Sequence, residues 1–324
     1  MTVPSLDERA SYVPPSSQSI STAQNEVTAL RLLLAQRRLY SKAKRWALLR
    51  SVGFSVVAVA APLITAIWPD ASVAVGAFAG VWIFLSRTAF VSAERYHSSR
   101  GAIVQELFDL RIYRMPQLAL RQPHVAPEEI SRLVGDDNTV QAAVTKERLR
   151  DWYPIDNELD GAATIAIAQR ANAACAERLL RSNAAIWLSL TVLWSVIAVI
   201  ISLLLGFSLA TFLLGVALPL LPALLDVFDQ WRTTRQAGAE RRALAQGIEE
   251  AIKHQDGKSW TAQDLLVWQE QLYNLRRDAP QIPNIVYRRT RKKNERDMKA
   301  AASGLADVAK AESTNSGHDE NGGP

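Results

Sequence analysis

The sequence predicts an all-α integral membrane protein in which four transmembrane helices form two hairpins with long cytoplasmic helical extensions. Two apolar blocks, residues 52–91 and 186–227, support this prediction. Turns at residues 68–70 and 206–208 divide the blocks into four arms, each within the range of about 17 to 25 residues that crosses a bilayer. Charged residues make up 21% of the chain, yet nearly all lie outside the arms. A soluble all-α protein with buried hairpins is the alternative, but a soluble helix normally keeps a polar face, which these arms lack.

Basic side chains indicate the orientation of the arms. Both turns lack Lys and Arg, whereas the opposite ends of the arms are basic. The flanking residues are Arg37, Arg38, Lys42, Lys44, Arg45 and Arg50 before the first arm, Arg87 and Arg95 at the end of the second, Arg178 and Arg181 before the third, and Arg232 and Arg235 after the fourth. By the positive-inside rule, both hairpins point outward and both termini and the middle segment are cytoplasmic. The net charge of +5 is therefore mainly a topology signal, and we do not expect nucleic acid as a partner.

The arms and their flanks divide the chain into seven parts. We expect a disordered N-terminus at residues 1–20, a cytoplasmic helix at 21–50, hairpin 1 at 51–91, a cytoplasmic helical region at 92–185, hairpin 2 at 186–227, a second cytoplasmic helical region at 228–299 and a disordered tail at 300–324. The first segment is rich in Pro and Ser and the last in Ala, Ser, Gly and acidic residues, compositions that favour disorder. The single cysteine, Cys175, excludes an intrachain disulfide and fits a reducing cytosol.

Local signals place helices within the cytoplasmic regions. The second arm is expected to continue as a helix to Ile112. Pro127, followed by two acidic residues, opens a short helix that Gly135 closes. Thr261 and Asp264 have the spacing of a capping box at the start of another helix.

Two glycines on the second arm, Gly76 and Gly80, are spaced for helix packing. Small residues four positions apart let two backbones approach closely. The partner helix is either the first arm of the same hairpin or a helix of a second copy.

Three hydroxyl side chains on the third arm, Thr191, Ser195 and Ser202, fall on roughly one helical face. Such a stripe can line a water path. Alternatively, the hydroxyls bond a neighbouring helix or the carbonyls four residues earlier in their own helix.

The fourth arm contains the features expected of a gate. Pro219 and Pro222 predict a kink, since proline removes a backbone hydrogen bond. Asp226 lies near the cytoplasmic mouth, where it can attract cations or pair with an Arg at the interface.

Signatures of catalysis are missing from the sequence. We find no glycine-rich phosphate loop, no HExxH and no pair of Cys or His at metal-ligand spacing. The sequence therefore indicates no catalytic residue, no metal site and no cofactor, and we expect a protein that is not an enzyme.

Several short motifs resemble those of one family. They are Ala35-Gln36-Arg37 with Tyr40 and Lys42-Ala43-Lys44, then Gln105-Glu106-Leu107-Phe108-Asp109, Asp151-Trp152-Tyr153-Pro154, Gln169-Arg170 with Asn172, and Ile282-Pro283-Asn284 with Tyr287 and Arg291. Their order, over residues 24–296, is similar to that of the bacterial four-transmembrane pore-forming effectors (S-4TM) encoded near nucleotide-second-messenger synthases in phage-defence loci. The run Tyr113-Arg114-Met115-Pro116-Gln117 departs from the family, which has a Phe or aliphatic-Pro-Trp run there.

The resemblance implies an effector of the bacterial inner membrane that disrupts the bilayer once an infection-induced signal reaches it. Its implied partners are lipid, further copies of the chain, and either a cyclic (oligo)nucleotide or a cytoplasmic protein as the trigger. Phosphate recognition would use Arg or Lys on the cytoplasmic helices. The alternative function is a membrane-anchored sensor or scaffold that binds a cytoplasmic partner without forming a pore.

Overall fold

The computed structural model describes residues 9–117, 125–204, 206, 208–213, 217–253 and 260–319, and all regular secondary structure in them is helical. The all-α prediction is therefore confirmed for this part of the chain. The elements are α2 (Ser17–Ala23), α3 (Val27–Ile67), the 3₁₀ turn η1 (Pro69–Ala71), α4 (Ser72–Leu85), the π turn η2 (Ser86–Phe90), α5 (Val91–Tyr113), α6 (Pro127–Val134), α7 (Asp137–Glu147), α8 (Gly161–Leu204), α9 (Leu209–Phe212), α10 (Leu218–Lys253), α11 (Ala262–Arg277) and α12 (Asn284–Asp319).

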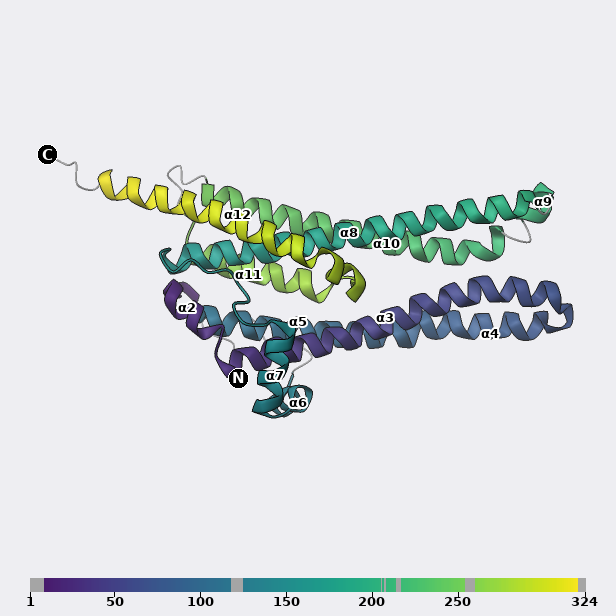
Figure 1. The fold of residues 1–324 in the computed structure, drawn as a ribbon, viewed down its shortest axis with the longest axis horizontal. Helices are drawn as coiled ribbons and strands as arrows, with labels where there is room; N and C mark the ends of the chain where they lie inside the picture. The colour runs from purple at the N-terminus through teal and green to yellow at the C-terminus, as the bar shows by residue number, and fades with distance from the viewer. Residues whose placement is uncertain are drawn as a thin grey trace.

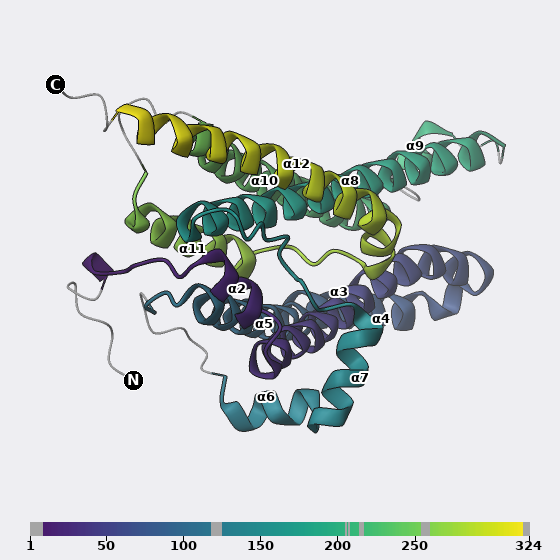
Figure 2. The ribbon, with the colours of Figure 1, turned by 60° about the vertical axis from the view of Figure 1, so that its left-hand side comes forward.

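The helices form two halves that lie side by side (Figure 1). The first half contains α2 to α7 and the second contains α8 to α12. One long helical pair projects from each half, α3 with α4 and α8 with α10, and both pairs point in the same direction (Figure 1). The other helices form a body at the opposite end, with α6 and α7 on the outer side of the first half (Figure 2).

Two helical stretches, Ser72–Tyr113 and Gly161–Leu204, are long and apolar enough to cross a membrane. The projecting pairs also expose many large apolar side chains, a feature that marks a surface covered by lipid or protein rather than water. Examples are Val52 and Val56 on α3, Val73, Phe78 and Phe84 on α4, Leu193, Leu203 and Leu204 on α8, and Leu221 and Leu225 on α10. The projecting pairs thus present an apolar surface that a further apolar partner, lipid or protein, would cover.

Helix α3 changes character along its length. Its first part has apolar residues at helical spacing, and Leu30, Leu33 and Leu34 are at most 1% exposed in the core of the body. Past Arg50 the same helix enters the projecting pair, where Val52 and Val56 are 51% and 57% exposed. One continuous helix therefore joins the packed body to the apolar end of the molecule.

The N-terminal segment differs from the prediction of disorder. Tyr12 is 8% exposed and donates a hydrogen bond from its hydroxyl to the carbonyl of Tyr113 at 2.8 Å. Ile20, in α2, is fully buried, and the Ser16 side chain caps this short helix. The contacts of Tyr12 and Ile20 are tertiary, so the Pro- and Ser-rich composition did not reveal them. Residues 1–8 lie outside the described residues.

The C-terminal tail also differs from the prediction, because α12 continues to Asp319. Ala302, Leu305 and Ala306 are at most 9% exposed and form a small apolar stripe at helical spacing. Lys310 pairs with Asp156 at 2.8 Å on the segment before α8. In a polar sequence, a stripe of three small or medium apolar residues is only a weak signal of a packed helix. The surface against which it packs is set by the fold and cannot be read from the local sequence. Residues 320–324 are not described.

Several local predictions are confirmed. The stretch Ser72–Tyr113 is helical throughout and contains one π turn, as expected from the continuous pattern to Ile112. Pro127 occupies the first turn of α6, and Gly135, with φ of 83°, ends it. The capping box of Thr261 and Asp264 is formed at the start of α11.

The structure shows close helix packing in the first pair at Gly53. A Cβ added to Gly53 would overlap the ring of Trp82, whereas no atom of the described residues lies within 4 Å of one added to Gly76 or Gly80. Packing of Gly76 and Gly80, against the first arm of the same hairpin or against another copy, stays a prediction.

Replacing Gly53 with Ala should destabilise the protein, because the new methyl group must displace the Trp82 ring and overpacking costs about 1–3 kcal/mol. Gly76→Ala is the matched control, since it adds the same methyl group to the same helical pair in open space. Thermal unfolding of the purified protein in detergent should separate the two variants. Equal melting temperatures would contradict the packing described here.

Candidate functional site

A buried ion pair joins the two halves of the body. Helix α5 supplies Asp109, which is fully buried, and α11 supplies Arg276, which is 7% exposed. Arg276 Nη1 donates to Asp109 Oδ2 at 2.6 Å, and Glu106 lies 3.8 Å from the same nitrogen. Burial alone would lower the pKa of Arg276, but Asp109, Tyr153 and Glu106 together raise it, so the guanidinium stays charged.

Amide and hydroxyl side chains extend this ion pair into a network. The hydroxyl of Tyr153 donates to Asp109 Oδ1 at 2.9 Å and accepts from Asn172 Nδ2 at 2.9 Å. Gln269 Nε2 donates to Glu106 at 2.8 Å and to Asp109 at 3.1 Å. Burial raises the pKa of Tyr153, with a further contribution from the Asp109 charge, so the phenol keeps the proton that it donates.

The network brings together three of the motifs that carry the family resemblance. Glu106 and Asp109 come from the motif at residues 105–109, Tyr153 from the motif at 151–154, and Asn172 from the motif around Gln169. Two further motifs meet nearer the projecting pairs, where Lys44 donates to Asn284 at 3.1 Å and Arg37 donates to the Tyr287 hydroxyl at 3.3 Å. The Tyr40 hydroxyl, which donates to Gln105 Oε1 at 3.5 Å, joins the two groups, so the scattered sequence motifs are in contact with one another.

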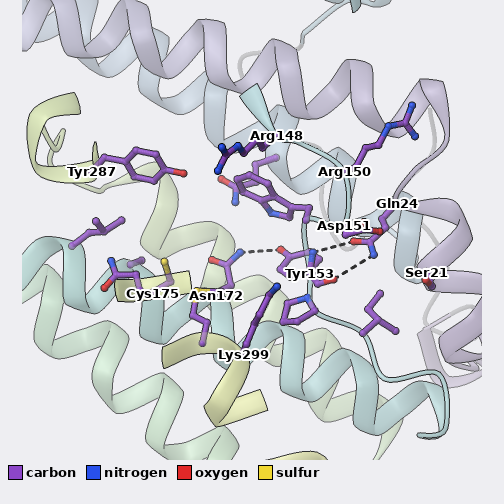
Figure 3. A pocket seen from close by; sticks show the side chains of 18 residues that line it. Ser21, Gln24, Arg148, Arg150, Asp151, Tyr153, Asn172, Cys175, Tyr287 and Lys299 are labelled. Carbon is purple, nitrogen blue, oxygen red and sulfur yellow. Dashed lines mark hydrogen bonds between the residues drawn. The ribbon is translucent and has the colours of Figure 1, made fainter. Parts of the chain in front are cut away.

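Beside the network lies a pocket of about 660 Å³, between the two halves. Its walls come from α2 and α5 of the first half, from α8 and α12 of the second, and from residues 148–155, which cross between them. In Figure 3, Arg148, Tyr287, Asn172 and Lys299 surround one opening, while the guanidinium of Arg150 points away. Its volume is within the range of about 300–1,000 Å³ found for small-molecule sites.

The floor of this pocket is held by Gln24. Its side-chain amide donates to the Tyr153 carbonyl at 3.3 Å and accepts from the Tyr153 N–H at 3.0 Å. Arg148 and Asp151 have φ of 54° and 51°, a left-handed conformation that costs free energy outside glycine. Gln24 and Tyr153 are buried and are joined by two hydrogen bonds. These bonds hold residues 148–155 in place and offset the free-energy cost of the left-handed conformations.

A second polar cluster lies where the projecting pairs leave the body. Asp226 on α10 approaches Arg87 at 3.6 Å and Arg50 at 4.0 Å, and Arg50 also pairs with Glu94 at 3.4 Å. Burial raises the pKa of Glu94, while the Arg50 charge opposes this shift. Of the two roles considered for Asp226, the structure contains the ion pair with arginines, and this pair links the two halves where the projecting pairs leave the body.

The predicted hydroxyl stripe is largely satisfied within its own helix. The Thr191 hydroxyl donates to the Trp187 carbonyl at 2.9 Å, and the Ser195 hydroxyl donates to the Thr191 carbonyl at 2.9 Å. Ser202 is 6% exposed. Thr191 and Ser195 therefore make the hydrogen bonds to carbonyls four residues earlier that were the alternative to lining a water path. Lining of a pore by this face stays a prediction.

Both prolines lie near the start of α10. Pro219 is the second residue of this helix and residue 217, just before the helix, is in a π turn, so a bend at Pro219 stays a prediction. Pro222 lies one turn further, so a bend at that residue stays a prediction.

Sequence reasoning missed Arg276 as a central residue. Its signal was present, because Leu265, Gln269, Leu272 and Arg276 follow one another at spacings of four, three and four on α11 and are all buried. A charged residue that continues an apolar stripe is buried with a partner. The acidic residues Glu106 and Asp109 follow the same logic on α5.

Residues 18–305 match the protein-family model described as the SMODS-associating 4TM effector domain. This chain belongs to that family. The match confirms the resemblance, and the description indicates an effector associated with SMODS nucleotide signalling systems. Together with the two apolar helices, it indicates a membrane protein. Comparison with curated proteins and with solved structures gives no match.

Within this 4TM effector domain, Arg276→Met should destabilise the protein by about 3–5 kcal/mol, because Asp109 and Glu106 would remain buried without a counter-charge. Arg277→Met is the matched control, since Arg277 is more than one third exposed and its pair with Asp278 contributes at most about 1 kcal/mol. Thermal and denaturant unfolding in detergent would measure the difference. Similar losses in both variants would contradict a central role for the buried pair.

Proposed function

We propose that this protein is an effector of the bacterial inner membrane that forms oligomers and permeabilises the bilayer when a nucleotide signal or a partner activates it. The observation that supports this most is the separation of the molecule into a polar body and two apolar helical pairs, together with membership of an effector family tied to nucleotide signalling. In this proposal the protein acts through its membrane helices and has no catalytic step.

The proposed topology has four membrane spans with both termini in the cytoplasm. The two projecting pairs point the same way, and their exposed apolar surfaces begin beyond the same ion cluster of Asp226, Arg50 and Arg87. Arginines at this level favour the cytoplasmic boundary of a membrane. The body, with its pocket and network, then lies in the cytoplasm, so the signal arrives from inside the cell.

A scaffold without pore activity is the second candidate. It is favoured by the hydroxyls of Thr191 and Ser195, which bond their own helix and leave little polar surface for a water path in one copy. A conducting path would then need several copies of the chain, and the open faces at Gly76 and Gly80 offer close approach between copies.

Co-expression with the nucleotide synthase of the same system should collapse the membrane potential. We expect a potential-sensitive dye to report depolarisation only when both the effector and an active synthase are present. A synthase inactivated at its catalytic acids is the control. If the potential persists and a protein partner co-purifies in stoichiometric amount, the scaffold function replaces the effector function.

The ion cluster at the membrane boundary should restrain the resting state, since Asp226 ties α10 to the first helical pair. Asp226→Asn removes one partly buried ion-pair partner, worth about 1 kcal/mol, and should lower the synthase expression needed for depolarisation by about fivefold. Asp229→Asn, one turn later on the same helix at an exposed position, is the matched control. An equal threshold in both variants would exclude a restraining role for Asp226.

A further inference from the structure

The pocket lies where the polar ends of the two candidate membrane helices approach each other. Gln105, on one wall, belongs to the stretch Ser72–Tyr113, and Asn172, on another, belongs to Gly161–Leu204. At about 1.5 Å per residue, each residue lies about 20 Å along its helix from the predicted apolar arm. A molecule in this pocket would therefore touch both helices outside the membrane.

The charges at the rim suit an anion. Arg148 and Lys299 are both exposed, and within the part of the chain that the structure describes neither makes an ion pair. Asp151, the only carboxylate among the described lining residues, accepts a hydrogen bond from Asn25 at 2.9 Å, and Arg150 donates to Gln141 at 3.0 Å. The available charge is therefore positive, and such side chains bind phosphate.

Flat and amide side chains form the remaining walls. Trp152 and Tyr287 are both half-buried lining residues, and aromatic rings of this kind stack on nucleobases. The Arg37 guanidinium lies 6.0 Å from the centre of the Tyr287 ring and holds its hydroxyl at 3.3 Å. The Asn172 amide donates one N–H to Tyr153 and retains a second N–H and a carbonyl oxygen for another partner. Side chains suited to bind phosphate, to stack on a base and to hydrogen-bond a polar edge therefore line one cavity.

We propose that this pocket is the signal site of the protein and binds a phosphorylated nucleoside ligand, with its phosphates at Arg148 and Lys299 and a base beside Trp152 and Tyr287. The inference rests on the proposed function, because it names the ligand class that would activate the effector. The crossing segment is pre-organised by Gln24 and Tyr153, so the ligand does not have to order it.

A ligand in the pocket would act on the membrane arms through α5 and α8. The ligand bridges α5 of one half and α8 of the other, so it favours whichever spacing of the halves fits its length. Both α5 and α8 belong to helical stretches that continue into an apolar arm, so a change in that spacing moves the arms as well. The ion cluster at Asp226 lies between the pocket and the arms and resists this movement.

Direct binding tests the site. The probes are c-di-GMP, c-di-AMP, 3′,3′-cGAMP, cyclic tri-AMP and ATP, with inorganic pyrophosphate as a probe that has charge but no base. They are titrated into the full-length protein in detergent, with thermal stability and calorimetry as readouts. We expect at least one nucleotide to bind, and Arg148→Ala with Lys299→Ala to weaken it by at least about tenfold. The matched control, Arg132→Ala with Arg296→Ala, removes the same charge from exposed positions outside the pocket lining and should keep the affinity within about threefold.

A second variant tests the cavity independently of charge. Ala176→Phe places a ring at a lining position of α8 and should abolish binding. If none of the nucleotide probes binds, if the two double variants bind equally, or if pyrophosphate binds as tightly as the best nucleotide, the proposed site is wrong, and depolarisation by the synthase would still support the effector function. Binding that follows these variants without any depolarisation would support the site and overturn the pore.

Discussion

The buried pair of Asp109 and Arg276 is the interaction on which the assembly of the body depends. It joins α5 and α11, which belong to different halves, and Tyr153 and Gln269 donate hydrogen bonds to the same Asp109 carboxylate. Asn172 in turn donates to the Tyr153 hydroxyl. A buried pair of this kind contributes little net stability compared with an apolar contact, but it fixes geometry, because either charge alone is strongly unfavourable in the core. Register between the halves is therefore specified by charge, while the surrounding leucines and alanines supply most of the favourable burial.

The sequence allowed the coarse architecture to be predicted because lipid-facing helices and caps are local patterns. The apolar arms, the continuous helix to Ile112 and the capping box at Thr261 each depend on neighbours within a few turns. Burial of Ile20 and the stripe at Ala302 and Leu305 depends on surfaces far away in the chain, so composition indicated disorder where the fold supplies partners.

The site was only partly predictable for the same reason. The motifs at residues 105–109 and 151–154 were recognised as a family pattern, but nothing local indicates that Tyr153 bonds Asp109 or that Gln24 holds the backbone of Tyr153. On the third arm, spacing placed Thr191 and Ser195 on one face correctly, while their hydrogen bonds point back along the helix. Periodicity identifies which face a side chain occupies, whereas the partner it chooses depends on distances that only the three-dimensional structure supplies.

The π turn at residues 86–90 has a geometric consequence for the helix that contains it. One turn of π-helix accommodates an extra residue, and each residue of an α-helix turns the chain by about 100°. The faces of α4 and α5 are therefore rotated about the helix axis relative to the positions they would have in an uninterrupted α-helix. Removal of a single residue here would restore continuous α-helical phase and rotate the apolar segment about its own axis relative to the packed segment. The helix thus contains an angular offset between its apolar segment and its packed segment.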